Sequence, residues 1–233
     1  MATTKNLYNL LETDIRFQEA MNSCMNCGVC TAICPASEFY DYDPRQIVVL
    51  VKSRDEEAIE NLLKSNTIWY CGQCMSCKMR CPRGNFPGLL INVLRRFSQE
   101  LGYFTENEKG RQQYALKTSI GHNILKYGYC IHPEIVKPEM HPEQGPIWKW
   151  VYDNLQEVYG RLGANLDGEG NGTLRKISKQ TLDELAKIFL ETGALDLWQN
   201  IETYSHQKAK EMNMTMEEYF EHIYNDTNEL HSC

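Results

Sequence analysis

The sequence predicts an all-α fold, with a helical N-terminal domain and a C-terminal helical extension. Two observations predict the helices. Apolar residues recur at helical spacing through much of the 233-residue chain. Helix-start signals precede several of these stretches. We expect three parts: a domain of residues 1–102, an irregular wrapping segment of residues 103–146 and a helical extension of residues 147–233.

Within residues 1–102 we expect four main helices. The first carries an apolar stripe of Leu7, Leu10, Leu11, Ile15 and Met21. The second begins at Asp43, which suits an N-cap, with Pro44 at the first helical position. The third opens on the capping box Ser53-Arg-Asp-Glu56. The fourth carries a stripe of Leu90, Leu94, Phe97 and Leu101. We interpret these stripes as core positions.

Eight of the ten cysteines lie in two identical motifs. The first reads Cys24-Met-Asn-Cys27-Gly-Val-Cys30-Thr-Ala-Ile-Cys34-Pro35, and the second reads Cys71-Gly-Gln-Cys74-Met-Ser-Cys77-Lys-Met-Arg-Cys81-Pro82. Both have the form C-x2-C-x2-C-x3-C-P, and they start 47 residues apart. Three thiolates at this spacing let one short loop bind three irons of a cubane. Two copies predict two [4Fe–4S] clusters.

The fourth cysteine of each motif is expected to serve the other motif's cluster, as it does in two-cluster ferredoxins. One cluster would be bound by Cys24, Cys27, Cys30 and Cys81. The other would be bound by Cys71, Cys74, Cys77 and Cys34. This exchange would tie the two halves together, so we expect the domain to fold only with its metal. Structural zinc and a disulfide framework fit this spacing less well.

Further residues connect the motifs to a known family. The two motifs are separated by Pro44-Arg45 and a helical pair, and Ile68-Trp69-Tyr70-Cys71 and Cys81-Pro82-Arg83-Gly84 accompany the second. Together they resemble the α-helical ferredoxin family over about residues 5–102. That family includes the C subunit of heterodisulfide reductase and the second half of succinate dehydrogenase iron–sulfur subunits.

The remaining sequence favours one branch of this family. The 23 residues before Cys24 are too few for the [2Fe–2S] domain of the succinate dehydrogenase type. Only Cys130 and Cys233 follow Cys81, too few for the CCG modules of glycolate oxidase-type and glycerol-3-phosphate dehydrogenase-type subunits. The chain therefore most resembles the C subunit of heterodisulfide reductase. The segment Arg161–Ile177 resembles the C-type subunit of the heterodisulfide reductase-like complex of sulfur-oxidising prokaryotes.

The resemblance implies an electron-transfer subunit that is not catalytic alone. It would belong to a hetero-oligomer and relay electrons between a flavin-containing A subunit and a B subunit. The B subunit bears the CCG modules and the sulfur chemistry. Two alternatives stay open: a stand-alone disulfide reductase, and an iron–sulfur redox sensor or scaffold with structural clusters.

The composition narrows the partners and the location. A net charge of −7 and a pI of about 5.4 argue against nucleic acid as the main partner. The longest aliphatic run, Ile47–Val51, is far short of the ~20 apolar residues of a membrane-spanning helix. Residues 1–10 show no signal-peptide core. We therefore expect a cytoplasmic protein.

We expect no ligand role for the two cysteines outside the motifs or for two histidines that precede prolines. Cys130 is expected to be a half-buried structural cysteine and Cys233 a free thiol at the chain end. His132 and His141 precede prolines and are expected to be loop residues.

Residues 167–172 partly resemble an EF-hand loop. However, position 12 of such a loop is Ser178 where glutamate is needed, so we expect a tight turn. Beyond it, the capping boxes Thr181–Glu184 and Thr215–Glu218 should open helices of the extension, which we interpret as a docking region for partners.

Charge is uneven around the two motifs. No Lys or Arg lies between Arg16 and Arg45. Basic residues surround the second motif, at Lys78, Arg80, Arg83, Arg95 and Arg96. Because positive charge favours a reduced cluster, we expect the second motif's cluster to have the higher potential.

Overall fold

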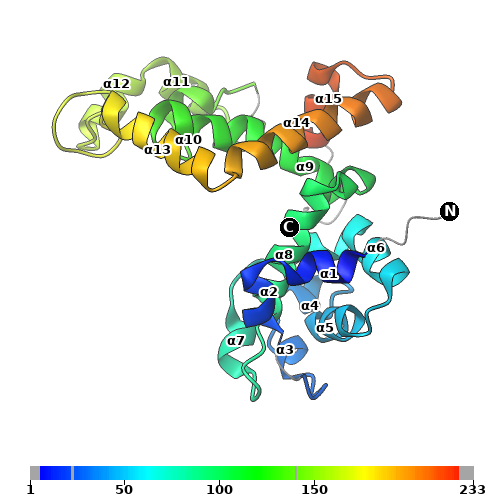
Figure 1. Ribbon diagram of the computed structural model, residues 1–233. Coiled ribbons are helices and arrows are strands. Elements are labelled where there is room, and N and C mark those ends of the chain that lie inside the picture. The colour runs from blue at the N-terminus through cyan, green and yellow to red at the C-terminus, as the bar shows by residue number, and fades with distance from the viewer. Residues whose placement is uncertain (1–5, 22–23, 140, 226–233) are drawn as a thin grey trace. The chain divides into compact units, whose positions relative to one another are not determined.

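The computed structural model describes residues 6–21, 24–139 and 141–225, and all regular structure in these residues is helical (Figure 1). The predicted all-α fold is confirmed. The described residues form two compact units, one of residues up to Gln113 together with those from Asn200 onward, the other of Tyr114–Gln199. Among the helices described, none combines the length and the apolar character needed to span a membrane.

The first unit contains the helices that surround the two cysteine motifs. They are α1 (Leu7–Glu12), α2 (Ile15–Ala20), α3 (Val29–Ala32), α4 (Ala36–Phe39), α5 (Pro44–Lys52), α6 (Glu56–Lys64), η1 (Thr67–Trp69), α7 (Ser76–Arg80), α8 (Pro87–Glu100) and η2 (Tyr103–Glu106). The same unit ends with α15 (Met216–Asn225). Two helices, α9 (Glu108–Leu116) and α14 (Ala194–Glu211), include residues of both units.

Helix α8 is the centre of the first unit. It contacts α1, α2, α5, α6 and α7, and Figure 1 shows these helices gathered around it. Leu90, Ile91 and Leu94 on α8 are fully buried, as are Val51 on α5 and Leu63 on α6. The apolar stripe predicted for this helix therefore forms the core.

The spacer between the motifs forms the two predicted helices, with one corrected start. Asp43 caps α5 by accepting hydrogen bonds from the Arg45 and Gln46 N–H groups, as expected. The N-cap of α6 is Asp55 and not Ser53, which instead ends α5. Glu56 leaves the capping box because its carboxylate accepts hydrogen bonds from the first N–H groups of α1.

Residues 7–21 form two helices where one amphipathic stripe was expected. Asp14 interrupts the stripe because its side chain caps α2, accepting from the Arg16 N–H at 2.9 Å. Ile15 consequently points to solvent and is 81% exposed, so its assignment to the core was wrong. Leu7, Leu11 and Phe17 are buried on the face toward the core.

The second unit is also built from helices. They are η3 (Lys117–Gly121), α10 (His122–Tyr127), η4 (Pro133–Ile135), η5 (Pro142–Gln144), α11 (Ile147–Asp153), α12 (Leu155–Arg161) and α13 (Lys179–Glu191). Much of the segment 103–146 is therefore helical, although we expected it to be irregular. Element η3 is a π-helical turn between α9 and α10, and such a turn shifts the apolar face and hides the helical period.

The structure corrects the interpretation of Cys130 and extends that of His132, which does lie in a loop. Cys130 is exposed and forms no disulfide, so it is not a half-buried cysteine. His132 lies between α10 and η4 but is buried, stacked on Tyr127 with Nε2 3.3 Å from the Asp167 carboxylate. It is therefore part of the core of the second unit. Cys233 lies outside the described residues.

The glycine-rich loop is a turn held by the amide of Asn165. This side chain donates hydrogen bonds to the carbonyl oxygens of Glu169 and Asn171, at 3.0 and 3.1 Å. Two carbonyl oxygens of the loop thus already accept from a donor of the protein, which agrees with the expected tight turn.

The later helix starts were predicted in part. Helix α13 begins earlier than expected, because Ser178 is its N-cap and accepts from the Thr181 N–H. The box at Thr215 is confirmed, since Thr215 and Glu218 each accept a hydrogen bond from the other's backbone N–H.

Asp14 connects the α2 N-terminus to α8 through two arginines. Its carboxylate lies 2.6 Å from Arg16 and 3.0 Å from Arg96. The hydrogen bond from Arg16 is the main cause that lowers the pKa of Asp14 to about 2, and burial opposes it. An unfolded aspartate has a pKa of about 3.9. The ionised form therefore stabilises the fold above about pH 4, and this contribution fades as the pH falls toward 2.

We predict that Asp14→Asn lowers the free energy of unfolding by about 1 to 2 kcal/mol at pH 7, less than the full linkage value because both arginines are partly exposed. The difference from wild type should be equal at pH 7 and pH 5.5, where Asp14 is ionised in both states. Anaerobic chemical denaturation measures it, with the exposed Asp41→Asn as control. A difference that vanishes already at pH 5.5 would contradict this assignment.

Candidate metal centre

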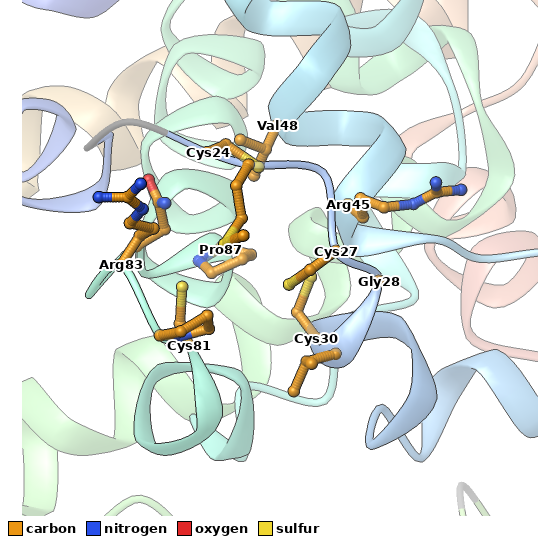
Figure 2. Close-up of a pocket in the computed structure, with 13 residues that line it drawn as sticks. Cys24, Cys27, Gly28, Cys30, Arg45, Val48, Cys81, Arg83 and Pro87 are labelled. Carbon is orange, nitrogen blue, oxygen red and sulfur yellow. The ribbon is translucent and has the colours of Figure 1, made fainter.

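Four cysteines surround the first pocket of the N-terminal domain. They are Cys24, Cys27, Cys30 and Cys81. The sulfurs face a common space, which Val48 of α5 and Pro87 of α8 help to enclose (Figure 2).

The other four motif cysteines surround a second pocket. They are Cys34, Cys71, Cys74 and Cys77. Tyr42, Pro44 and Gly88 also line it. The two pockets therefore gather the same two sets of cysteines that the sequence assigned to separate clusters.

Contacts between the two motifs explain this grouping. The short motif helices α3 and α7 pack against each other. The Phe86 N–H also donates to the Ala20 carbonyl oxygen at 3.0 Å, which joins the chain after the second motif to the chain before the first. As a result, Cys81 reaches the first pocket and Cys34 reaches the second.

The two motif loops share an unusual backbone geometry. Left-handed φ angles occur two and four positions after the first cysteine in each motif. In the first these are Asn26 (58°) and Gly28 (78°), and in the second Gln73 (53°) and Met75 (62°). The repeated angles turn each loop around its pocket in the same way. In the first motif Asn26 and Gly28 are residue types that favour this conformation, whereas Gln73 and Met75 of the second rarely adopt it.

Polar side chains hold each motif against its neighbouring helices. Beside the first pocket, Asp43 accepts a hydrogen bond from Thr31 and pairs with Arg45 at 2.9 Å. Beside the second, Arg95 of α8 donates to the carbonyl oxygens of Ile68 and Cys71, both at 2.7 Å. Neither contact was anticipated from the sequence.

The protein environment acts differently on individual thiols. Burial raises the pKa of Cys30 and of Cys77, although the Gly88 N–H lowers the latter in part. Hydrogen bonding from Ser76 lowers the pKa of Cys74. Since the thiolate is the form that binds metal, loading the buried cysteines releases protons.

The donor set fits a four-iron cluster. Within the described ranges, no three Cys, His, Asp or Glu side chains converge as ligands of a single ion. A cubane instead takes one thiolate at each of four separate irons, so its ligands surround a volume. Four thiols around an enclosed space, as in each pocket, provide such an arrangement.

Cations lie closer to the first pocket than the sequence suggested. Arg45 and Arg83 both line it, and no Lys or Arg is among the residues that line the second. The exchange of cysteines explains the difference, because Arg83 follows Cys81 into the first pocket. In Figure 2 the Arg45 side chain extends away from the sulfurs. Its guanidinium pairs with Asp43 at 2.9 Å. Arg95 lies beside the second pocket, where it donates to the Cys71 carbonyl oxygen, so both pockets have a cation nearby and the expected order of potentials stays a prediction.

Two buried polar side chains that the sequence did not single out also line the pockets. Asn85 lies at the first pocket and Tyr42 at the second. In the part of the chain that the structure describes, neither side chain has a hydrogen-bond partner. Burial raises the pKa of Tyr42, so its hydroxyl remains protonated.

Comparisons with known proteins agree with this centre. Residues 20–85 match the family model of the 4Fe-4S dicluster domain. The C subunit of the ferredoxin:CoB-CoM heterodisulfide reductase of Methanosarcina acetivorans is 34% identical over 161 residues, 68% of this chain and 61% of the relative. The C 2 iron-sulfur subunit of the CoB--CoM heterodisulfide reductase of Methanocaldococcus jannaschii is 28% identical over 145 residues, 60% and 71% of the two chains.

A third relative is also a C-type subunit of a heterodisulfide reductase. The C2 subunit of the H(2)/formate:CoB-CoM heterodisulfide,ferredoxin reductase of Methanococcus maripaludis is 30% identical over 105 residues, 45% of this chain and 54% of the relative. The matches thus span 54% to 71% of these three relatives' lengths.

Fold, cysteine motifs and comparisons together define a helical iron–sulfur protein whose cofactors are [4Fe–4S] clusters. Within that class, the chain belongs to the family of heterodisulfide reductase C subunits.

The left-handed position at Gly28 gives a test of the loop geometry. A Cβ at Gly28 would meet no atom within 4 Å, so alanine there costs only backbone strain, about 1 to 2 kcal/mol. Gly72 of the second motif has equally open surroundings and no positive φ. We predict that Gly28→Ala destabilises the loaded protein by this amount in anaerobic thermal unfolding, while Gly72→Ala is neutral or slightly stabilising. Equal effects of the two variants would contradict the repeated loop geometry.

Proposed function

We propose that this chain is an electron-transfer subunit that binds two [4Fe–4S] clusters and relays electrons between partner proteins. The first cluster would be held by Cys24, Cys27, Cys30 and Cys81. The second would be held by Cys71, Cys74, Cys77 and Cys34. No residue of the chain is assigned a catalytic role.

The close spacing of the two pockets is the observation that carries the proposal. Cys30 and Cys34 are four residues apart across α3, and Cys77 and Cys81 are four apart across α7. A helix rises about 6 Å over four residues, so the backbone positions that serve different pockets lie close together in each motif. An electron held at one pocket has a short path to the other.

Each pocket has one exposed cysteine, and an exposed ligand would give electrons a route between the cluster and a partner protein. Cys27 is the exposed cysteine of the first pocket, and Cys74 is the exposed cysteine of the second. The remaining motif cysteines are partly covered by the protein. Each pocket thus has one side open to a partner and one side packed on the core.

The residues of the chain would hold the clusters and keep them from water, while a bound cluster supplies a site that gains or loses one electron. Thiolates fix the irons, and apolar residues such as Val48 and Pro87 limit access of solvent. Arg95 keeps the backbone before Cys71 in place through its two hydrogen bonds. Little rearrangement is then needed when the charge changes.

Names of the relatives support a multi-subunit setting. They are C subunits of heterodisulfide reductases. We infer that this chain likewise works in a hetero-oligomer, between a flavin-containing A subunit and a B subunit with CCG modules. We also infer a cytoplasmic location and a role in sulfur metabolism, as in the sulfur-oxidation complex that residues 161–177 resemble. The helical extension would contribute to docking of these partners.

Serine variants test the assignment of cysteines to clusters. Cys27→Ser and Cys81→Ser should abolish the same signal in electron paramagnetic resonance (EPR) spectra, and Cys74→Ser and Cys34→Ser should abolish the other. Iron should fall from about eight to about four per chain in each variant. Cys130→Ser, which replaces an exposed cysteine outside both pockets, should change neither.

The decisive result is which variants lose the same EPR signal. If Cys81→Ser removed the same signal as Cys74→Ser, each motif would bind its own cluster and the exchange would be wrong.

The relay role is tested with the purified, loaded chain. We expect it to accept electrons from a low-potential chemical donor and to show no turnover of disulfide substrates. With the co-purified partner subunits added, we expect turnover of the disulfide substrate and reoxidation of the chain. Disulfide reduction by the chain alone would identify a stand-alone reductase. A loaded chain that never exchanges electrons with its partners would favour a sensor or scaffold.

A further inference from the structure

The hydroxyl of Tyr42 is buried at the second pocket without a hydrogen-bond partner. Tyr42 is only 3% exposed and lines this pocket together with Cys34 and Cys71. Its Oη atom accepts or donates no hydrogen bond within the residues that the structure describes. Although no hydrogen bond of ordinary length and angle reaches the hydroxyl, Cys71 acts on it most strongly, through its charge and as a side-chain hydrogen-bond partner, and Cys34 acts more weakly through its charge.

The backbone of Tyr42 is fixed, so its side chain has no easy route to solvent. The Ser37 hydroxyl donates to the Tyr42 carbonyl oxygen at 2.6 Å, and the Tyr42 N–H donates to the Tyr40 carbonyl oxygen at 2.8 Å. Asp43, the next residue, caps α5 and holds Thr31. Tyr42 is therefore anchored between the first motif and the start of α5.

A buried hydroxyl without a partner destabilises a protein, and native structures rarely keep one. A phenol is a neutral donor below about pH 10. The acceptors within its reach in this pocket are cysteine sulfurs, and a thiolate sulfur that binds iron is a stronger acceptor than a thiol. A Cys71 thiolate would therefore supply the hydrogen-bond acceptor that the Tyr42 hydroxyl lacks.

We propose that Tyr42 donates a hydrogen bond to the Cys71 thiolate when the second cluster is bound, and thereby raises the reduction potential of that cluster. The proposal rests on the proposed function. Reduction adds one negative charge to the cluster and its ligands, so a fixed donor stabilises the reduced form more than the oxidised form. No bond breaks, and the Tyr42 proton stays on its oxygen.

Tyr42→Phe removes the donor and keeps the ring in the core. In anaerobic redox titration followed by EPR, we expect the reduced-to-oxidised ratio of the second cluster at fixed potential to fall about tenfold, a shift of about −59 mV for a one-electron couple. The first cluster should keep its potential. The signals are assigned by the loss seen in Cys74→Ser and Cys27→Ser.

Tyr40→Phe is the matched control. Tyr40 lies two residues away and stacks on Tyr70, with ring centroids 4.3 Å apart, but it does not line the pocket. Loss of its hydroxyl should leave both potentials unchanged. Unchanged potentials in Tyr42→Phe, or a shift confined to the first cluster, would overturn the proposal while leaving the two-cluster relay intact. Absence of clusters from the wild-type chain would overturn both.

A second measurement does not depend on the variant's stability. In wild-type protein grown with tyrosine deuterated at the two ring positions beside the hydroxyl, electron–nuclear double resonance of the reduced second cluster should detect coupled deuterons. Tyr42 is the only tyrosine among the residues described as lining this pocket. A second cluster without deuteron coupling would place the hydroxyl too far away and contradict the hydrogen bond.

Discussion

The exchange of cysteines between the two motifs is the constraint on which the rest of the N-terminal domain depends. Cys81 joins the three leading cysteines of the first motif, and Cys34 joins those of the second. Neither motif can complete a four-thiol pocket alone. The 47 residues that separate the motif starts must therefore fold so that α3 and α7 meet. A bound cluster would then act as a cross-link, which couples metal loading to folding.

The helices around the motifs form much of the pocket walls and hold the second motif in place. The central helix α8 contributes Pro87 and Gly88 to the pocket walls at its start, and Arg95 further along holds the second motif. Helix α5 contributes Val48 and Pro44. Because the same two helices form both the core and the pocket walls, the clusters would sit on the most rigid part of the domain. A rigid, largely apolar surrounding suits a relay, since it limits rearrangement when the charge changes.

Sequence reasoning reached the fold class, because helical periodicity and helix-start signals are local; its two ligand sets coincide with the cysteines that line the two pockets and stay a prediction. It failed where tertiary contacts compete with local signals. Glu56 matched a capping box with Ser53, but its carboxylate caps α1 instead. Ile15 continued an apolar stripe that Asp14 breaks. The π-helical turn η3 hid the period of residues 103–146. Within the site, the left-handed Met75 and the buried Tyr42 hydroxyl gave no signal, since neither residue type predicts its backbone angle or its distant neighbours.

The most direct test of this account is native mass spectrometry of the anaerobically purified chain. The account predicts a mass that exceeds the polypeptide by two Fe₄S₄ units, lost together when Cys34 and Cys81 are both replaced by serine. A mass that corresponds to bound zinc, or to one Fe₄S₄ unit in intact wild-type protein, would contradict the shared four-thiol pockets from which everything else follows.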